Sequence, residues 1–134
     1  MNKERLLRLA NEILPKVVEE KFDMGVWQCD TSACAMGWAC MDPVFKSEGL
    51  QFNTASNYGN SGYSVYPWFE GEVTFRAAAK FFGLSEKQAE YLFDPGSYQD
   101  AAYRNRKRIN YLGYMMVAKE DVIERIHMLV GEGA

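Results

Sequence analysis

The chain is poor in the residues that build disulfide frameworks and histidine-based chemistry. Its 134 residues include three cysteines and one histidine. An odd number of cysteines cannot form a complete set of intramolecular disulfides. A cysteine nucleophile is usually paired with a histidine base, and His127 is the only candidate in this sequence. The composition therefore disfavours a secreted domain stabilised by disulfides. It also means that a catalytic cysteine would have only one histidine available as its base.

The sequence also lacks a long apolar run. Its first residues, MNKERLLRLANEILP, carry a charge every few positions. A secretory signal needs an uninterrupted apolar core, and a membrane-spanning helix needs about 20 apolar residues. No Asn-x-Ser/Thr glycosylation sequon occurs. We therefore expect a soluble cytoplasmic protein without a membrane partner, whose cysteines remain thiols in a reducing compartment.

An excess of positive charge is missing as well. Lys and Arg number 15 against 18 Asp and Glu, for a net charge of −3. Broad binding to nucleic acid needs a clustered positive surface, so this balance argues against a nucleic-acid partner. The hydrophobic share of 48% is typical of a folded chain, and a chain of this length can bury a core without metals or disulfides. We expect residues 1–134 to form a single globular domain.

Helical hydrophobic spacing is present at both ends of the chain. It predicts a first helix from Lys3 to Leu14, which Pro15 ends because its ring cannot continue a helix interior. It also predicts a last helix from about Lys119 to Val130. The apolar face of that helix carries Val122, Ile123, Ile126, Leu129 and Val130. Each helix should therefore bury one face against a core.

The middle of the chain predicts a β-hairpin followed by two short helices. Weak alternation in Gly49–Thr54 and in Tyr63–Pro67, on either side of the turn-forming ASNYGNSG, predicts two paired strands. Thr74 and Ser85 are the expected N-caps of two helices, and Gly83 suits the left-handed position between them. The predicted fold class is α+β, a mostly helical single domain of about five helices with one small β-hairpin.

All three cysteines lie in one stretch, CDTSACAMGWAC, at residues 29–40. Thr31 is the expected N-cap of a short helix from Ser32 to about Cys40, and Pro43 should close it. The stretch is compatible with a zinc site, a reactive thiol, a disulfide or a closely packed helix. Its spacing and its neighbours help to rank these interpretations.

Zinc, thiol and disulfide chemistry each fit this stretch poorly. The spacings are C-x4-C and C-x5-C, and no second pair follows, whereas structural zinc takes four ligands. Cys34 would lie in the first turn of its helix, where the helix dipole favours a thiolate. However, its neighbours do not match the papain-type signature. A disulfide between Cys29 and Cys34 is sterically possible, but the expected reducing compartment disfavours it.

Packing is the favoured interpretation of the stretch. Cys34 and Trp38 lie four residues apart on one helix face, and Ala33 and Gly37 form a small-residue face that lets another backbone approach. Free cysteine behaves as a small buried hydrophobe. We therefore expect this helix to lie at the centre of the core, with other elements packed around it. The residues expected to form the motif and core are Phe22, Trp27, Cys29, Cys34, Gly37 and Trp38.

Two blocks of the sequence, FDMGVWQCDTSACAMGWAC and AAAKFFGLSEKQAEYLFDPGSY, resemble a group of small phage and bacterial proteins of unknown function. These proteins share a pattern close to F-D-M-x2-W-x-C-G-T-x-A-C-x2-G-W, followed by an F-F-G-L-S step before a second short helix. The resemblance spans roughly residues 22–98 and departs at Asp30, where the pattern has Gly. It implies that Cys29 and Cys34 belong to the family pattern, Cys40 less so. It also implies a phage or mobile-element origin, hence the host cytoplasm, and no particular reaction.

Two further segments are candidates for contact with a partner. The segment YGNSGYSVYPWF, residues 58–69, interleaves aromatics with Gly, Ser and Asn, which is the composition of binding loops. The segment RNRKR, residues 104–108, concentrates basic side chains that suit an acidic or phosphate-bearing partner. The candidate partner-binding residues are Tyr58, Tyr63, Tyr66, Trp68, Arg104, Arg106 and Arg108.

Taken together, these residues favour a non-enzymatic protein–protein interaction module that modulates a host or defence factor. The partner would be a protein of the host or of the phage, and we expect no catalytic residue, cofactor or bound metal. Two alternatives stay open. One is a cysteine-dependent enzyme or zinc-binding protein centred on Cys29 and Cys34. The other is a nucleic-acid binder that uses the basic cluster at residues 104–108.

Overall fold

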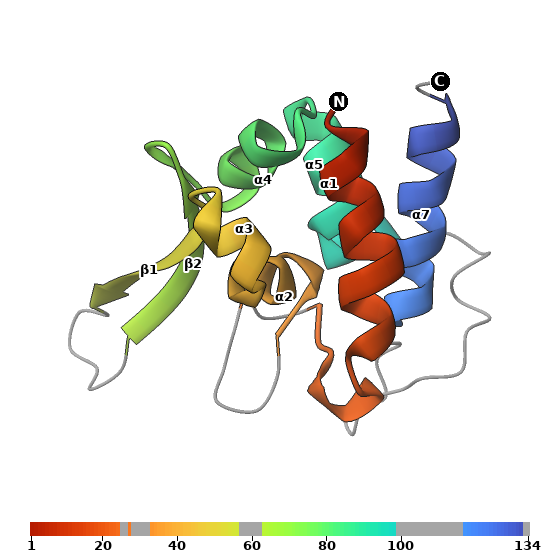
Figure 1. Cartoon of the computed structure of the whole chain (residues 1–134). Coiled ribbons are helices and arrows are strands. Elements are labelled where there is room, and N and C mark those ends of the chain that lie inside the picture. Colours follow the sequence, from red (N-terminus) through yellow and green to blue (C-terminus); the bar gives the residue numbers. More distant parts are fainter. Residues whose placement is uncertain (25–26, 28–32, 57–62, 99–116, 133–134) are drawn as a thin grey trace.

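The computed structural model describes residues 1–24, 27, 33–56, 63–98 and 117–132, with the backbone alone at 54–56, 63–64 and 132 (Figure 1). The chain is mostly helical and carries a small antiparallel sheet, so the predicted α+β class is confirmed. The sheet lies at one side of the molecule and the two terminal helices lie at the other. The shorter helices fill the space between them (Figure 1).

The N-terminal helix consists of three consecutive pieces. The α-helix α1 (Lys3–Arg8) continues into a π-helical turn, η1 (Leu9–Ile13), and then into a 3-10 turn, η2 (Leu14–Lys16). Pro15 lies within η2, and the backbone becomes extended at Val17. The helix was predicted to end at Leu14, but it continues as a 3-10 turn through Pro15 and ends at Lys16. Proline still prevents a longer α-helix, because it removes an amide that such a helix would need.

The cysteine-rich helix begins later than expected. A 3-10 turn, η3 (Glu19–Lys21), precedes it, and the helix itself is α2 (Ala35–Met41). The predicted start at Ser32 with Thr31 as N-cap is wrong, because the N-cap is Cys34, whose Sγ accepts a hydrogen bond from the Gly37 amide at 3.4 Å. A thiol can replace the usual hydroxyl here because it lies beside a free amide of the first turn.

A helix that the sequence did not predict follows directly. Pro43 was expected only to close the preceding helix, but it is the first residue of α3 (Pro43–Ser47). Asp42 caps this helix by accepting a hydrogen bond from the Phe45 amide at 3.1 Å. Proline at the first helical position costs nothing, because its missing amide would have had no partner there.

The predicted hairpin is part of a three-stranded sheet in the order β1-β2-β3. Its strands are β1 (Gln51–Ser56), β2 (Tyr63–Phe69) and β3 (Glu72–Val73). Glu70 and Gly71 join β2 to β3 with positive φ values of 46° and 86°, which is the pattern of a tight hairpin turn. The prediction therefore missed one short strand and ended β2 two residues early.

Two helices follow the sheet, α4 (Thr74–Phe82) and α5 (Glu86–Phe93). Gly83 adopts the predicted left-handed conformation with φ of 66°, and Ser85 forms a capping box with Gln88, as expected of an N-cap. The predicted cap at Thr74 is wrong. Thr74 is the first residue of α4, has a φ of 53°, and follows Val73, which makes no side-chain cap.

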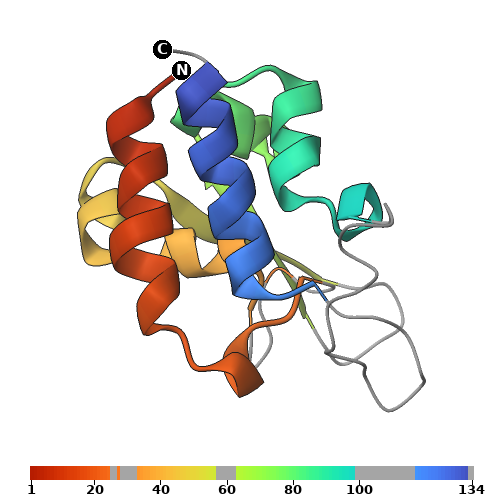
Figure 2. The same ribbon diagram turned by 90° about the vertical axis from the view of Figure 1, so that its right-hand side faces the viewer.

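The last elements are a 3-10 turn, η4 (Pro95–Tyr98), and the helix α7 (Lys119–Glu132). The expected apolar stripe of α7 is confirmed, since Val122, Ile126 and Leu129 are buried. Helices α1 and α7 run antiparallel, with α5 beside α7 (Figure 2). The N-terminal end of α1 is fixed by a hydrogen bond from the Asn2 amide to the Phe82 carbonyl at 2.7 Å.

Most buried hydrophobic side chains of the described residues form one cluster. A group of phenylalanine rings lies at its centre, contributed by α3, β2, α4 and α5. Their ring centroids are 4.8 to 5.9 Å apart, mostly in edge-to-face contacts, the geometry that aromatic pairs prefer. These rings are Phe45, Phe69, Phe81, Phe82 and Phe93.

Candidate interaction surfaces

The described cysteines lie in the interior. Cys34 and Cys40 are buried free thiols, and the Cys34 Sγ lies 3.9 Å from the Trp27 carbonyl oxygen. Burial raises the pKa of the Cys34 thiol to about 11, although the Gly37 amide partly opposes the shift. Burial also raises the pKa of Cys40. Both thiols are therefore neutral at pH 7, and a neutral buried thiol is a poor nucleophile. Cys29 lies outside the described residues.

The only histidine of the sequence is exposed, whereas both described cysteines are buried. His127 lies on the exposed side of α7, where its Nε2 is 2.7 Å from the Oδ1 of Asn11. Cys34, by contrast, is 1% exposed at the start of α2. Among the residues that the structure describes, no three His, Cys, Asp or Glu side chains are grouped so as to hold a metal ion. The described residues therefore offer no arrangement for thiol or zinc chemistry.

The motif residues pack around the start of α2. Phe22 is fully buried and pairs with Ala33 through an isolated parallel bridge. Gly37 is also buried, and a Cβ atom there would collide with the Trp27 carbonyl oxygen. The half-buried Trp27 ring meets Phe75 edge-on, with centroids 5.1 Å apart. The small residue at position 37 therefore allows the close backbone approach that the sequence predicted.

Trp38 reaches the surface, unlike a central core residue. It is half-buried, and its Nε1 donates a hydrogen bond to the Lys21 carbonyl oxygen at 3.1 Å. This bond holds the indole against the segment that follows η2. One side of the ring borders a groove formed by the first helix, that segment and α2.

This Trp38 groove has a volume of about 410 Å³. Its apolar lining comes from Ile13, Val17, Val18, Trp38 and Met41. Val18 is 53% exposed, and it is one of the most exposed large hydrophobic side chains among the described residues. A surface depression with an exposed apolar lining is a feature of sites that bind ligands or partner side chains.

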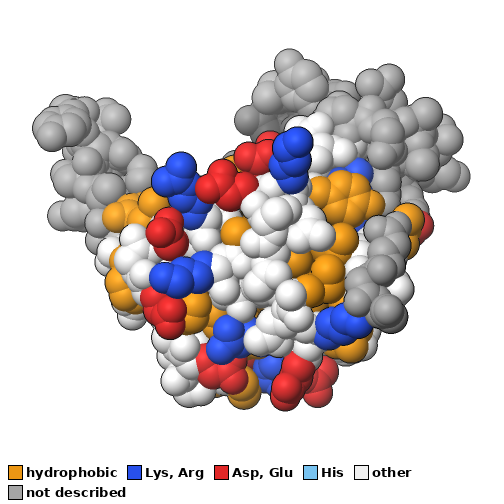
Figure 3. Space-filling view, turned by 90° about the horizontal axis from the view of Figure 1, so that it is seen from above, with side chains coloured by type: hydrophobic (Ala, Val, Ile, Leu, Met, Phe, Trp, Pro, Cys, Tyr) orange, Lys and Arg blue, Asp and Glu red, His pale blue; other side chains and the backbone are white. Residues whose placement is uncertain are grey.

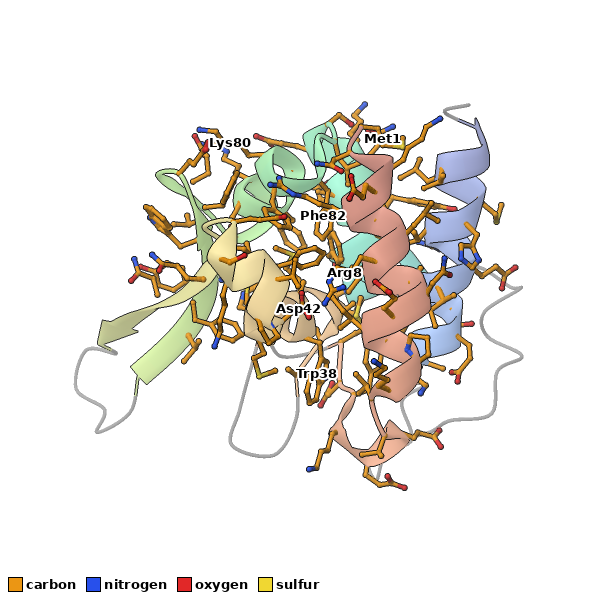
Figure 4. All side chains as sticks on the ribbon, in the orientation of Figure 1. Met1, Arg8, Trp38, Asp42, Lys80 and Phe82 are labelled. Carbon is orange, nitrogen blue, oxygen red and sulfur yellow. The ribbon has the colours of Figure 1, made fainter. Side chains whose placement is uncertain are left out.

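A partly buried ion pair forms one wall of the Trp38 groove. Arg8 donates two hydrogen bonds to the Asp42 carboxylate, from Nε to Oδ2 at 2.9 Å and from Nη2 to Oδ1 at 3.0 Å. Burial alone would raise the pKa of Asp42, but the hydrogen bonds from Arg8 and from the Phe45 amide outweigh it and hold this pKa below its usual value. Figure 4 shows the two side chains pointing toward each other, with Trp38 below them.

The sheet presents a second surface. Phe69 is 6% exposed and meets Phe81 of α4, with ring centroids 5.0 Å apart. Because successive strand residues point to opposite faces, Tyr66 and Trp68 lie on the face of β2 away from this contact. In the sheet register Trp68 stands between Gln51 and Val73, and Tyr66 stands opposite Asn53. We call these five residues, Gln51, Asn53, Tyr66, Trp68 and Val73, the outer sheet face.

The outer sheet face is mixed in polarity and partly exposed. Gln51, Asn53 and Val73 are exposed, Val73 to 40%, while Tyr66 and Trp68 are half-buried. The strands β1 and β2 extend away from the helices (Figure 1). Aromatic side chains are thus available on a sheet face that projects from the body of the molecule.

The remaining predicted partner residues are not placed by the structure. Tyr58 and the arginines Arg104, Arg106 and Arg108 lie outside the described residues. Tyr63 is the first residue of β2, and its backbone alone is described. The structure therefore brings together Tyr66 and Trp68 from the predicted set, and it adds Val73, which the sequence did not single out.

A buried arginine is the main feature that the sequence did not predict. Arg125 is 1% exposed, and its guanidinium donates hydrogen bonds to the Tyr91 and Ser97 carbonyl oxygens at 2.6 and 2.8 Å. The guanidinium lies 3.6 Å from the centroid of the Tyr98 ring. Its position beside Ile126 on the apolar side of α7 was the only available sequence signal. The contacts indicate that Arg125 holds the end of α5 and η4 against α7.

Surface charges on the described residues are interspersed. Arg5 pairs with Glu48, and Lys80 lies near Glu70. Figure 3 shows positive and negative side chains alternating on the face seen from above. A nucleic-acid site needs a continuous positive surface, and that face of the described residues does not provide one.

Comparison with known proteins adds no assignment. No family model, no curated protein and no solved structure matches the chain. None of the described helices combines the length and the apolar character that crossing a membrane requires. A functional proposal therefore rests on the geometry of the Trp38 groove and the outer sheet face.

Proposed function

We propose that this chain is a non-enzymatic protein–protein interaction module of phage type that binds a host or phage protein through the outer sheet face. Such binding would modulate a host or defence factor. The supporting observation is the position of Trp68, which stands between Gln51 and Val73 in the middle of a sheet face pointing away from α4.

The residue types on this face suit protein recognition. Trp and Tyr are enriched among the residues that contribute most to binding free energy, and the contacts around such residues exclude water from them. Here Tyr66 and Trp68 are adjacent on one face, with Gln51 and Asn53 opposite them on β1. A partner that covered this face would bury the two rings and keep hydrogen-bonding groups at the margin.

The partner's origin is proposed from the sequence. The resemblance of residues 22–98 to small phage and bacterial proteins is the reason for seeking the partner in a bacterial host or its phage. The described cysteines lend no support to the enzyme or zinc alternative, since both thiols are buried and their pKa values are raised. The basic cluster at 104–108 lies outside the described residues, and the nucleic-acid alternative therefore gains no supporting contact.

The experiment is affinity capture from a bacterial lysate, with bound proteins quantified by mass spectrometry. The test variant is Tyr66→Ala combined with Trp68→Ala. The matched control is Met128→Ala, which truncates a side chain 48% exposed on α7, away from the sheet. We expect wild type and control to recover the same protein, and the double variant to recover it at least tenfold less. Circular dichroism must show equal helix content in all three.

Two results would end the proposal. One is equal recovery of every enriched protein by the wild type and the double variant. The other is the absence of any protein enriched above a bead control in several candidate hosts. If partner affinity is measured afterwards, truncation of either ring alone should cost about 2 kcal/mol at a central position.

A further inference from the structure

The Trp38 groove lies beside an irregularity in the first helix. The helix widens from α1 into the π-helical turn η1, which contributes Glu12 and Ile13 to the groove. A π-helical turn is rare and costs stability, and it occurs frequently at functional sites. Its position at this groove is a second observation, independent of the groove's shape, that points to a binding role.

The bond from Trp38 to the Lys21 carbonyl orients the groove's largest apolar surface. That bond satisfies the only polar atom of the indole side chain. The rest of the ring can therefore contact an apolar group without leaving a buried donor unpaired. Val18 and Met41 extend the same apolar lining. The volume of about 410 Å³ lies within the usual range of roughly 300–1,000 Å³ for ligand pockets.

The charges around the groove are unevenly compensated. Arg8 pairs with both Asp42 and Glu12, whose Oε2 lies 2.9 Å from its Nη1, so these three side chains carry one net negative charge. Lys16 and Lys21 are exposed, and within the described part of the chain neither has an ion-pair partner. Glu19 and Glu20 line a neighbouring hollow on the side of Lys119, and this hollow shares Lys16 with the groove. Three cationic and two anionic side chains line the groove, so its lining carries one net positive charge next to the apolar residues.

We propose that the Trp38 groove binds a short acidic segment of a partner protein, with one apolar side chain of that segment on Trp38 and carboxylates beside Lys16 and Lys21. This site is separate from the outer sheet face, and it stands whether or not that face binds a protein. An acidic segment fits better than a basic one because the groove lining has a net positive charge and its two carboxylates both bind Arg8, whereas Lys16 and Lys21 have no ion-pair partner among the described residues.

The first test uses a displayed library of random dodecapeptides selected against the immobilised full-length chain. We expect enrichment of peptides in which an aliphatic or aromatic residue is flanked by Asp or Glu. Binding of the enriched peptides should be at least tenfold weaker to a Lys16→Glu, Lys21→Glu variant. It should also weaken from 50 to 500 mM NaCl, because salt screens exposed charges.

The matched control is a Lys46→Glu, Lys87→Glu variant. It makes the same change in net charge at two exposed lysines that do not line the groove. Binding to this variant should stay within about twofold of wild type, the range of a general charge effect. An equal loss of binding in both variants would show non-specific attraction and overturn the proposal, as would no enrichment or the selection of basic peptides.

The second test locates the bound peptide by nuclear magnetic resonance. The chain has three tryptophans, so three indole signals can be assigned with single Trp→Phe variants. We expect the best peptide to shift the Trp38 signal and leave the Trp68 signal in place. A shift of the Trp68 signal alone would show that the peptide binds at the outer sheet face. That result would support the proposed function and overturn the proposal for the groove. If phosphatidylglycerol vesicles shift the Trp38 signal and the peptide does not, the groove binds lipid, and the proposal of an acidic peptide segment is overturned.

Discussion

The carbonyl oxygen of Trp27 occupies the place where a side chain at Gly37 would begin. Trp27 precedes α2 and Gly37 lies in its first turn, so this contact joins the connecting segment to the helix that follows it. The neighbouring Cys34 thiol lies between the two, accepting from the Gly37 amide and 3.9 Å from the Trp27 carbonyl. Several properties of the cysteine-rich stretch follow from this close approach.

Replacing Gly37 by Ala should destabilise the protein. The added methyl group would meet backbone atoms, which cannot move aside as a flexible side chain can, and overpacking of this kind costs about 1–3 kcal/mol or more. Gly131→Ala is the control, because that position in α7 has nothing within 4 Å and alanine favours a helix by up to about 1 kcal/mol. Urea unfolding of both variants measures the difference. An unchanged midpoint for Gly37→Ala would contradict the packing.

The thiols of Cys34 and Cys40 should resist alkylation in the folded protein. Burial raises the pKa of Cys34 to about 11 and raises that of Cys40 as well, so the reactive thiolate is scarce at pH 8. The native protein should be treated with iodoacetamide, then unfolded, treated with a second reagent and mapped by mass spectrometry. Both cysteines should carry only the second label. Rapid native labelling of Cys34 would revive the reactive-thiol alternative.

The Arg8–Asp42 pair should give stability that depends on pH. The pKa of Asp42 is lower in the folded state than its unfolded value of about 3.9. Its contribution is therefore present above about pH 4 and is lost as pH falls through the folded value. Asp42→Asn keeps an oxygen that can cap α3 but removes the charge, so it should be less stable than wild type at pH 7.

The difference between Asp42→Asn and wild type should shrink below pH 4. Urea unfolding at pH 7 and pH 3 measures it. Glu86→Gln is the control, because its pair with Arg76 is largely exposed, with side chains 59% and 68% accessible, and such pairs contribute about 0–1 kcal/mol. A gap between Asp42→Asn and wild type that is equally large at both pH values would mean that the carboxylate charge is not responsible.

Arg125→Lys should be destabilising although it preserves the charge. The planar guanidinium bonds the Tyr91 and Ser97 carbonyl oxygens and lies against Tyr98, a combination that an ammonium group cannot reproduce. One buried carbonyl left without a partner costs about 1–3 kcal/mol. Arg76→Lys, on an exposed side chain, is the control. A melting temperature equal to that of wild type would show that Arg125 does not hold η4 against α7.

The sequence alone determined the features that depend on neighbouring residues. Ser85 and Gln88 form a capping box, Gly83 ends α4 in the left-handed conformation, and Pro15 lies in the last turn of the first helix. These features could be predicted because capping groups and φ limits act within a few residues of the chain. The apolar stripe of α7 could also be predicted from the sequence, since helical periodicity shows which face must be buried.

The tertiary structure decided the features that depend on distant contacts. The helix α2 begins only at Ala35, with Cys34 as its cap and the Trp27 carbonyl packed against Gly37, whereas local preference favoured Thr31 as the cap. Arg125 is buried because carbonyls and rings from α5 and η4 surround it. Trp38 borders a groove because the segment after η2 meets only one side of it. Burial depends on which elements meet in space, and a short stretch of sequence does not contain that information.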